Sequence, residues 1–141
     1  MPGVADLQEK IRTELEPHRE VLAAYLFGSV GRGTSGPLSD VDIAVLLSDE
    51  VDPWTVQLDL MSAIASAIGS SDVDVVVLNR APVSLGYRVL RDGVLLLSRD
   101  ERARIRHWVA TVSSYIDMEP FRRALSEGTH HRIVEGRFGR S

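Results

Sequence analysis

The sequence contains no cysteine. Without thiols the protein forms no disulfide, uses no cysteine nucleophile and holds no cysteine-ligated zinc, and nothing in its composition indicates secretion. No apolar run approaches the ~18 residues that a membrane span needs, and the charged N-terminal stretch lacks the apolar segment of a signal peptide. We therefore expect a cytoplasmic protein without a membrane partner.

A surplus of positive charge is also missing, because 16 basic residues stand against 20 acidic ones and the net charge is −4. Proteins that bind long nucleic acids without sequence preference usually carry a basic surplus or stripe, so we expect no such binding. The 141 residues are 44% hydrophobic and 26% charged, which is typical of globular proteins. A chain of this length buries roughly two-thirds of its unfolded surface, which favours one domain with a real core.

Hydrophobic patterning predicts alternating helices and strands. Apolar residues at helical spacing predict helices over 4–16, from Asp52-Pro53 to Gly69, over 83–91, and from the Ser98–Glu101 capping box to just before Pro120. Short apolar runs predict strands over 21–27, from the aspartates at 40 and 42 to 47, over 73–78 and over 94–97. This order predicts an α/β fold with a small mixed sheet flanked by helices, followed by a loose tail over 126–141.

Two aspartates spaced two apart open the second predicted strand, in SDVDIAVLL. Side chains alternate across a strand, so Asp40 and Asp42 project from one face with roughly 6.5–7 Å between their alpha carbons. At a charge separation of ~6 Å and an effective dielectric of ~20, they repel by roughly 3 kcal/mol, so a recessed pair implies a cation. In the alternative, Asp40 caps a turn and Asp42 faces water.

A third carboxylate lies in the next predicted strand, in SSDVDVVVLN. If this strand pairs beside the second, Asp74 comes near Asp40 and Asp42, whereas Asp72 is the alternative at the exposed start of the strand. Three converging carboxylates carry a charge that two magnesium ions offset, and two-metal sites activate an attacking oxygen and stabilise the leaving one. These residues favour phosphoryl chemistry.

A glycine-rich stretch, FGSVGRGTSG, follows the first predicted strand. Its backbone N–H groups can approach an anion closely, the Ser29 hydroxyl can donate to a phosphate oxygen, and Arg32 adds a positive charge. Alone, such a stretch is more often a plain turn than a phosphate site. The combination with the aspartates changes this balance in favour of phosphate binding.

The pattern Gly28-Ser29, ten residues, Asp40-x-Asp42, and then Asp74 resembles the nucleotidyltransferase superfamily whose fold is named for DNA polymerase beta. The chain looks closest to minimal nucleotidyltransferases, which often act as MntA-type antitoxins with HepT-type toxins of the HEPN class. The likeness covers roughly residues 21–106. It implies a nucleotidyltransferase domain over 1–118, with a core at about 21–98 and a C-terminal helix at about 99–118, and an extension over 119–141.

The resemblance also implies a reaction, which is transfer of AMP from ATP to a hydroxyl. In the antitoxin branch, the acceptor is a tyrosine of the toxin, which is a ribonuclease bound in a hetero-oligomer. The resemblance makes Asp40 and Asp42 ligands of the nucleotide-bound magnesium, and Asp42 with Asp74 ligands of a second magnesium that activates the acceptor. Asp74 would also suit the role of base.

For the nucleotide, the resemblance implies contacts from the glycine-rich stretch. Gly28 and Ser29 would hold the β and γ phosphates, and Arg32 would face the triphosphate or shape the loop. Ser39 would complete the nucleotide site. At Val30 family members often have a basic or small residue, so we assign this position no contact.

Three functional classes follow: an antitoxin that adenylylates a protein, a nucleotidyltransferase with a small-molecule acceptor such as an aminoglycoside, and a noncatalytic toxin-binding subunit. Only about forty residues follow the core, which favours the first class over the second, because antibiotic-modifying relatives usually carry an extra helical domain. The complete set of carboxylates counts against the third class.

Other residues have simpler interpretations. His130 and His131 lie in the polar tail without a positioned third ligand, so we interpret them as a solvated pair. Trp54 and Trp108 lie on apolar helical stripes, which favours core packing over base stacking. The arginines at 99, 102, 104 and 106 form a solvated face or, alternatively, a docking surface for an acidic partner.

Overall fold

The computed structural model describes residues 3–28 and 41–125, and within these ranges it confirms the predicted α/β fold. Four strands form one mixed sheet in the order β3-β2-β1-β4. β1 pairs antiparallel with β2 and with β4, whereas β2 and β3 are parallel. The strands are β1 (Val21–Phe27), β2 (Val41–Leu47), β3 (Val73–Val77) and β4 (Val94–Ser98).

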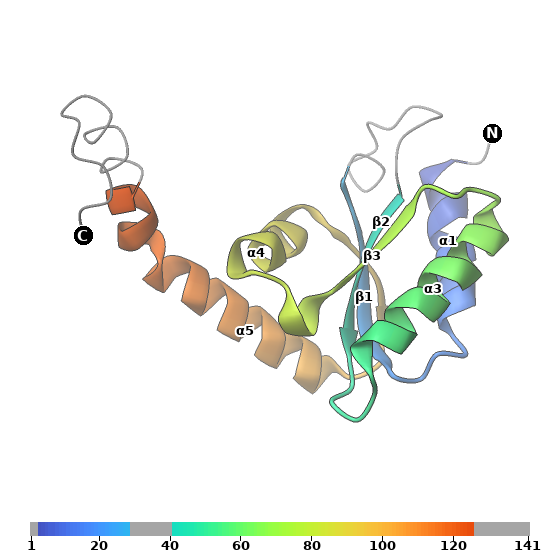
Figure 1. Cartoon of the computed structure of the whole chain (residues 1–141), viewed down its shortest axis with the longest axis horizontal. Helices are drawn as coiled ribbons and strands as arrows, with labels where there is room; N and C mark the ends of the chain where they lie inside the picture. Colours follow the sequence, from blue (N-terminus) through green and yellow to red (C-terminus); the bar gives the residue numbers. More distant parts are fainter. Residues whose placement is uncertain (1–2, 29–40, 126–141) are drawn as a thin grey trace.

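Helices cover both faces of the sheet (Figure 1), with α1 and α3 on one face and α4 and α5 on the other. Because side chains alternate along a strand, β2 contributes to two cores. Ile43 and Val45 pack with α1 and α3, whereas Ala44 and Leu46 pack with α4 and α5. The helices are α1 (Val4–Leu15), α3 (Pro53–Ile68), the short 3₁₀ helix η1 (Leu78–Arg80), α4 (Val83–Asp92) and α5 (Glu101–Asp117).

The predicted ends of α3 are confirmed. The Asp52 carboxylate accepts a hydrogen bond from the Trp54 N–H at 3.3 Å, and Pro53 occupies the first helical position. Gly69 ends the helix with φ of +70°, the left-handed conformation that glycine adopts without strain. This helix connects β2 to β3 in parallel, so it determines that the two strands begin at the same edge of the sheet.

The predicted buried face of α3 is partly wrong. The sequence suggests a face through Trp54, Leu58, Met61, Ala65 and Ile68. The last three pack partly buried against the core, but Trp54 and Leu58 are 61% and 59% exposed. The buried residues of the helix are Val56, Leu60 and Ile64. Apolar residues occur nearly all around α3, so its periodicity did not specify one face. The Trp54 ring instead lies under a surface arginine, because the Arg80 guanidinium stands 4.9 Å from the ring centroid.

The predicted cap of α5 is also wrong. Ser98 still belongs to β4, where it pairs with Ala23, and its hydroxyl donates to the Glu101 carboxylate at 2.6 Å. The cap is Asp100, whose carboxylate accepts from the Ala103 N–H at 3.0 Å. The sequence pattern was right about where a helix begins and wrong about which oxygen caps it.

Helix α5 leaves a row of large apolar side chains uncovered. Ile105, Trp108, Val109 and Ile116, called the α5 stripe below, are 46–61% exposed. The predicted core packing of Trp108 is therefore wrong, because the buried residues of α5 are Ala103 and Thr111. Figure 1 shows that the C-terminal part of α5 also extends away from the sheet.

The chain is helical again over 119–125, after a turn at Met118. The division at 118 into a domain and an extension stays a prediction. The tail with His130 and His131 lies outside the described residues. Within the part of the chain that the structure describes, no helix has the length and apolar character needed to cross a membrane.

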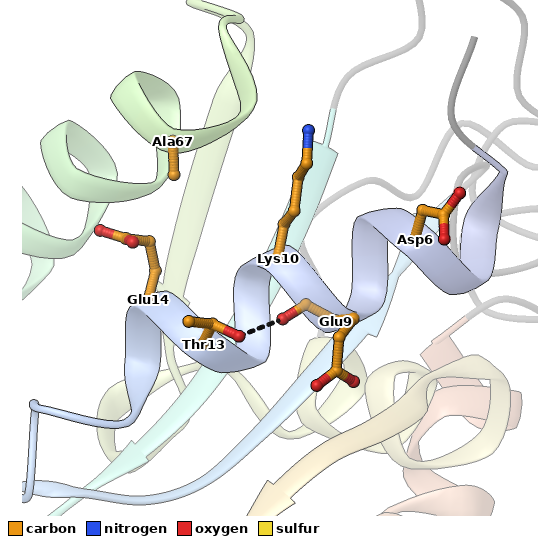
Figure 2. A pocket seen from close by; sticks show the side chains of 6 residues that line it. All are labelled: Asp6, Glu9, Lys10, Thr13, Glu14 and Ala67. Carbon is orange, nitrogen blue, oxygen red and sulfur yellow. Dashed lines mark hydrogen bonds between the residues drawn. The ribbon is translucent and has the colours of Figure 1, made fainter.

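A shallow hollow of about 640 Å³ separates α1 from α3 on the surface (Figure 2). Charged side chains of α1 surround it, and the Thr13 hydroxyl donates to the Glu9 carbonyl at 2.8 Å along the same helix. The hollow lies between the two helices of one face, away from the predicted aspartate site on the other. Its size alone does not make it a functional site.

The half-buried His107 of α5 predicts a loss of stability in acid. Burial lowers the pKa of His107 below its ordinary value of about 6.5. Between the lowered pKa and about 6.5, the unfolded chain binds the proton more readily, so the free energy of unfolding falls as the pH falls through this window. We expect His107→Gln to lose less stability than the wild type between pH 7 and pH 5 in urea denaturation. An equal loss in both proteins would contradict this assignment.

Candidate active site

The end of β1 and the starts of β2 and β3 meet at one edge of the sheet. Because β1 and β2 are antiparallel, the end of one lies beside the start of the other, and Phe27 pairs with Asp42. Because β2 and β3 are parallel and in register, Asp42 pairs with Asp74. Neighbouring strands lie ~4.8 Å apart, so the two carboxylates share one small region of this edge.

Both aspartates lie on the face that α4 and α5 cover. Their neighbours Val41 and Val73 are buried among the side chains of α1 and α3, so the next residue on each strand faces the other way. Asp74 is exposed and Asp42 is half-buried. Asp72 precedes β3, is exposed, and accepts a hydrogen bond from the Val41 N–H through its backbone carbonyl at 2.8 Å. Asp74 is thus the residue in register with Asp42.

Gly28 lies directly beneath the Asp42 carboxylate. A Cβ atom at Gly28 would stand 2.4 Å from Oδ2 of Asp42, a separation that real Cβ atoms essentially never show. Gly28 also has φ of +80°, in the left-handed region that disfavours other residues. The positive φ therefore favours glycine here, and a larger residue would also displace the Asp42 carboxylate.

A cavity of about 210 Å³ opens at this point, and it includes residues that the sequence analysis missed. Phe27, Gly28 and Asp42 line it from the sheet, and Arg88 and Asp92 line it from α4. The two α4 residues are four positions apart and so share one side of the helix. In the sequence, their spacing of four just before Gly93 could have indicated that they share one side of a helix. Nothing in the sequence showed that this helix approaches the aspartates.

Gly93 brings the end of α4 to the strand that leads into the site. Its N–H donates to the Val89 carbonyl at 2.7 Å, and a Cβ atom there would stand 2.5 Å from that oxygen. The same Cβ would lie 3.4 Å from the carbonyl oxygen of Leu26, and the next residue, Val94, pairs with Leu26. The last turn of α4 is thereby packed against the end of β1.

Asp92 is held by its neighbour. The Arg91 guanidinium donates to both Asp92 oxygens at 2.9 Å, and these hydrogen bonds raise the pKa of Arg91. Asp92 therefore brings a carboxylate to the cavity whose charge is partly offset by Arg91, on a different element from Asp42.

The remaining predicted site residues lie outside the described ranges, namely Ser29, Arg32, Ser39 and Asp40, as does Val30. Over residues 3–28 and 41–125 no cluster of three metal-ligating side chains is found. The two carboxylates that are described, Asp42 and Asp74, are of the oxygen type that magnesium prefers, and the close fit of Asp42 over Gly28 positions one of them. This donor set fits a magnesium ion.

Comparison with known sequences identifies the family. The pattern described as "Polymerase beta, Nucleotidyltransferase" matches residues 9–102, which include the sheet, α3 and α4. The protein adenylyltransferase MntA of Shewanella oneidensis is 37% identical over 101 residues, which are 72% of this chain and 70% of that protein.

Solved structures give the same result. The chain aligns to a toxin–antitoxin structure containing AMP-PNP with a TM-score of 0.74 at 32% identity, covering 87% of this chain and 98% of the other. It aligns to a complex of the tri-AMPylated Shewanella oneidensis HEPN toxin with its MNT antitoxin with a TM-score of 0.65 at 28% identity, over 87% and 98%. The chain therefore belongs to the polymerase beta nucleotidyltransferase family and is a nucleotidyltransferase.

Proposed function

We propose that this protein is an antitoxin that transfers AMP from ATP to a tyrosine hydroxyl of a HEPN-type ribonuclease toxin and thereby neutralises it. The observation that carries the proposal is the in-register pairing of Asp42 with Asp74 beside Gly28. The names of the relatives support the acceptor class, since MntA is a protein adenylyltransferase and a related structure holds an AMPylated HEPN toxin.

Asp42 and Asp74, together with Asp40, would hold the magnesium, and we propose two ions. When bound, such ions lower the charge of the triphosphate and the pKa of the acceptor hydroxyl. Gly28 has no side chain in the way of a phosphate and, with Ser29, would hold the β and γ phosphates through backbone N–H groups. Arg32 and Ser39 would complete the nucleotide site.

The proposed transfer makes one bond and breaks one. The tyrosine oxygen attacks the α phosphorus of ATP, and the bond from that phosphorus to the oxygen bridging the β phosphate breaks. Pyrophosphate leaves with the electron pair of this bond. The hydroxyl proton passes to the Asp74 carboxylate, which is exposed and so accessible to an acceptor on another protein.

The α5 stripe offers the surface on which the toxin would dock. Exposed apolar side chains at helical spacing favour a protein partner, and the exposed Arg102 and Arg106 flank Ile105 and Val109 around a groove of α5. Arg99 does not belong to this surface, because its guanidinium donates to the backbone carbonyls of Val21 and Glu16 at 3.1 and 3.2 Å. On the toxin, the added phosphodiester would repel the RNA backbone as well as fill space.

Co-expression with a HEPN-type ribonuclease from the same genome, followed by intact-mass spectrometry, tests the proposal. We expect a stable complex and a toxin whose mass is raised by one or more AMP groups. Co-expression with Asp42→Asn should give the unmodified mass, and replacing the acceptor tyrosine of the toxin by phenylalanine should do the same.

Two outcomes would contradict the proposal. A toxin that is inhibited without a gain in mass, with ATP and magnesium supplied, would identify a noncatalytic binding subunit. Failure to form any complex, with AMP transferred instead to a hydroxyl of a small molecule such as an aminoglycoside, would identify the small-molecule class.

A further inference from the structure

We propose that Arg88 of α4 binds the triphosphate of ATP and positions it over the aspartates. This inference rests on the nucleotide half of the proposed function and is independent of the acceptor. Arg88 lines the same cavity of about 210 Å³ as Gly28 and Asp42, and among the described residues of that lining it is the basic one. Arg88 does not belong to the motif of Gly28, Ser29 and the aspartates, because it lies on α4.

The carboxylates around the cavity favour a cation on the protein as well as the magnesium. Asp42 and Asp92 both line it, and Asp74 is paired with Asp42 on the next strand. A triphosphate that enters this region meets several carboxylates, each of which repels it. A guanidinium facing the same space offsets this repulsion, and its planar fork matches two phosphate oxygens at once.

Arg88 suits this role better than its neighbour Arg91. Both ends of the Arg91 fork are engaged by Asp92 at 2.9 Å. The ion pairs found over residues 3–28 and 41–125 do not include Arg88. Its side chain is exposed and lines the cavity. One arginine of α4 therefore orients Asp92, and the other is available to a ligand.

Helix α4 is held firmly enough to present Arg88 in a defined place. On one side, Gly93 packs its last turn against Leu26 of β1. On the other, the Tyr87 ring stacks on Tyr115 of α5 with 3.7 Å between centroids and 7° between planes. Val89, which follows Arg88, is fully buried in the core between the sheet and helices α4 and α5. Arg88 is thus placed by the residues on either side of it.

Calorimetric titration of ATP with magnesium tests the assignment without any acceptor. We expect Arg88→Ala to weaken ATP binding about 10- to 100-fold, as for the loss of hydrogen bonds to a charged group. Arg88→Lys should recover only part of the affinity, because a lysine supplies a point charge without the fork. The matched control is Arg19→Ala, an exposed arginine in the turn between α1 and β1, which should bind ATP as the wild type does.

A second titration with AMP distinguishes a phosphate contact from a change in the whole site. If Arg88 binds the β or γ phosphate, Arg88→Ala should leave the weaker AMP affinity unchanged, and thermal melting should show a folded protein. Wild-type ATP affinity in Arg88→Ala would overturn the inference, even where the toxin is still modified. In a third outcome, the wild type binds ATP, Arg88→Ala does not, and no toxin is modified. This result would overturn the proposed acceptor but support the role of Arg88 in ATP binding.

Discussion

Asp42→Asn is expected to abolish nucleotide transfer, with a fall in rate of about 1,000-fold or more, while the protein stays folded. The variant keeps the shape of the side chain but removes the negative charge that would hold magnesium beside Asp74. Asp74→Asn should have the same effect. Transfer of labelled AMP from ATP, measured in a single turnover on the co-purified partner, gives the rate.

The neighbouring Asp72 provides the matched control. It carries the same group but stands before β3, out of register with Asp42, so Asp72→Asn should keep most of the activity. Removing one of two close like charges relieves repulsion, so without metal we expect Asp42→Asn to melt at the wild-type temperature or above it. Unchanged transfer by both Asp42→Asn and Asp74→Asn would contradict the metal site, and a large loss of stability would indicate a structural role for these aspartates.

Gly28→Ala should also stop transfer, for a different reason. The new Cβ atom would stand 2.4 Å from Oδ2 of Asp42, so the carboxylate must rotate away from the place where it would hold magnesium. The positive φ adds a cost of roughly 1–2 kcal/mol to folding. We expect a folded protein of lower melting temperature that transfers no AMP in the same single-turnover assay.

Gly69→Ala separates the two effects. Gly69 has φ of +70°, close to that of Gly28, but no atom lies within 4 Å of the Cβ that it would gain. This variant should lose a similar stability and keep wild-type transfer. Loss of transfer in Gly69→Ala would show that reduced stability alone explains the Gly28 result. Full activity in Gly28→Ala would show that transfer does not depend on the position of the Asp42 carboxylate seen in the structure.

Much of the fold could be predicted because local signals agreed with one another. In α3, an aspartate cap, a proline and a terminal glycine surround a helical apolar run. The strands are short apolar runs, and the pattern of glycine, serine and aspartates was specific enough to indicate a family. Where a single local rule determines the backbone, the sequence was sufficient.

The errors arose where tertiary contacts select among equivalent local choices. The apolar residues of α3 did not show which of its faces is buried, and in the structure Val56 is buried whereas Trp54 is exposed. The stripe of α5 has the spacing of a core helix, yet that helix extends beyond its sheet. Arg88 could not be assigned to the site, because its role depends on the way Gly93 packs α4 against β1.

The parallel pairing of β2 and β3 has a consequence for the order in which the protein folds. The strands β1 and β2 are neighbours in the sequence, but β2 and β3 can pair only after the chain has passed through the whole of α3. Contacts between distant parts of a sequence form late, because the entropy of closing the intervening loop is lost before any contact forms. Asp42 and Asp74 are such a contact, so a newly made chain can pair β1 with β2 before the two carboxylates meet. The capacity for catalysis therefore arises later in folding than the β1–β2 pair to which Asp42 belongs.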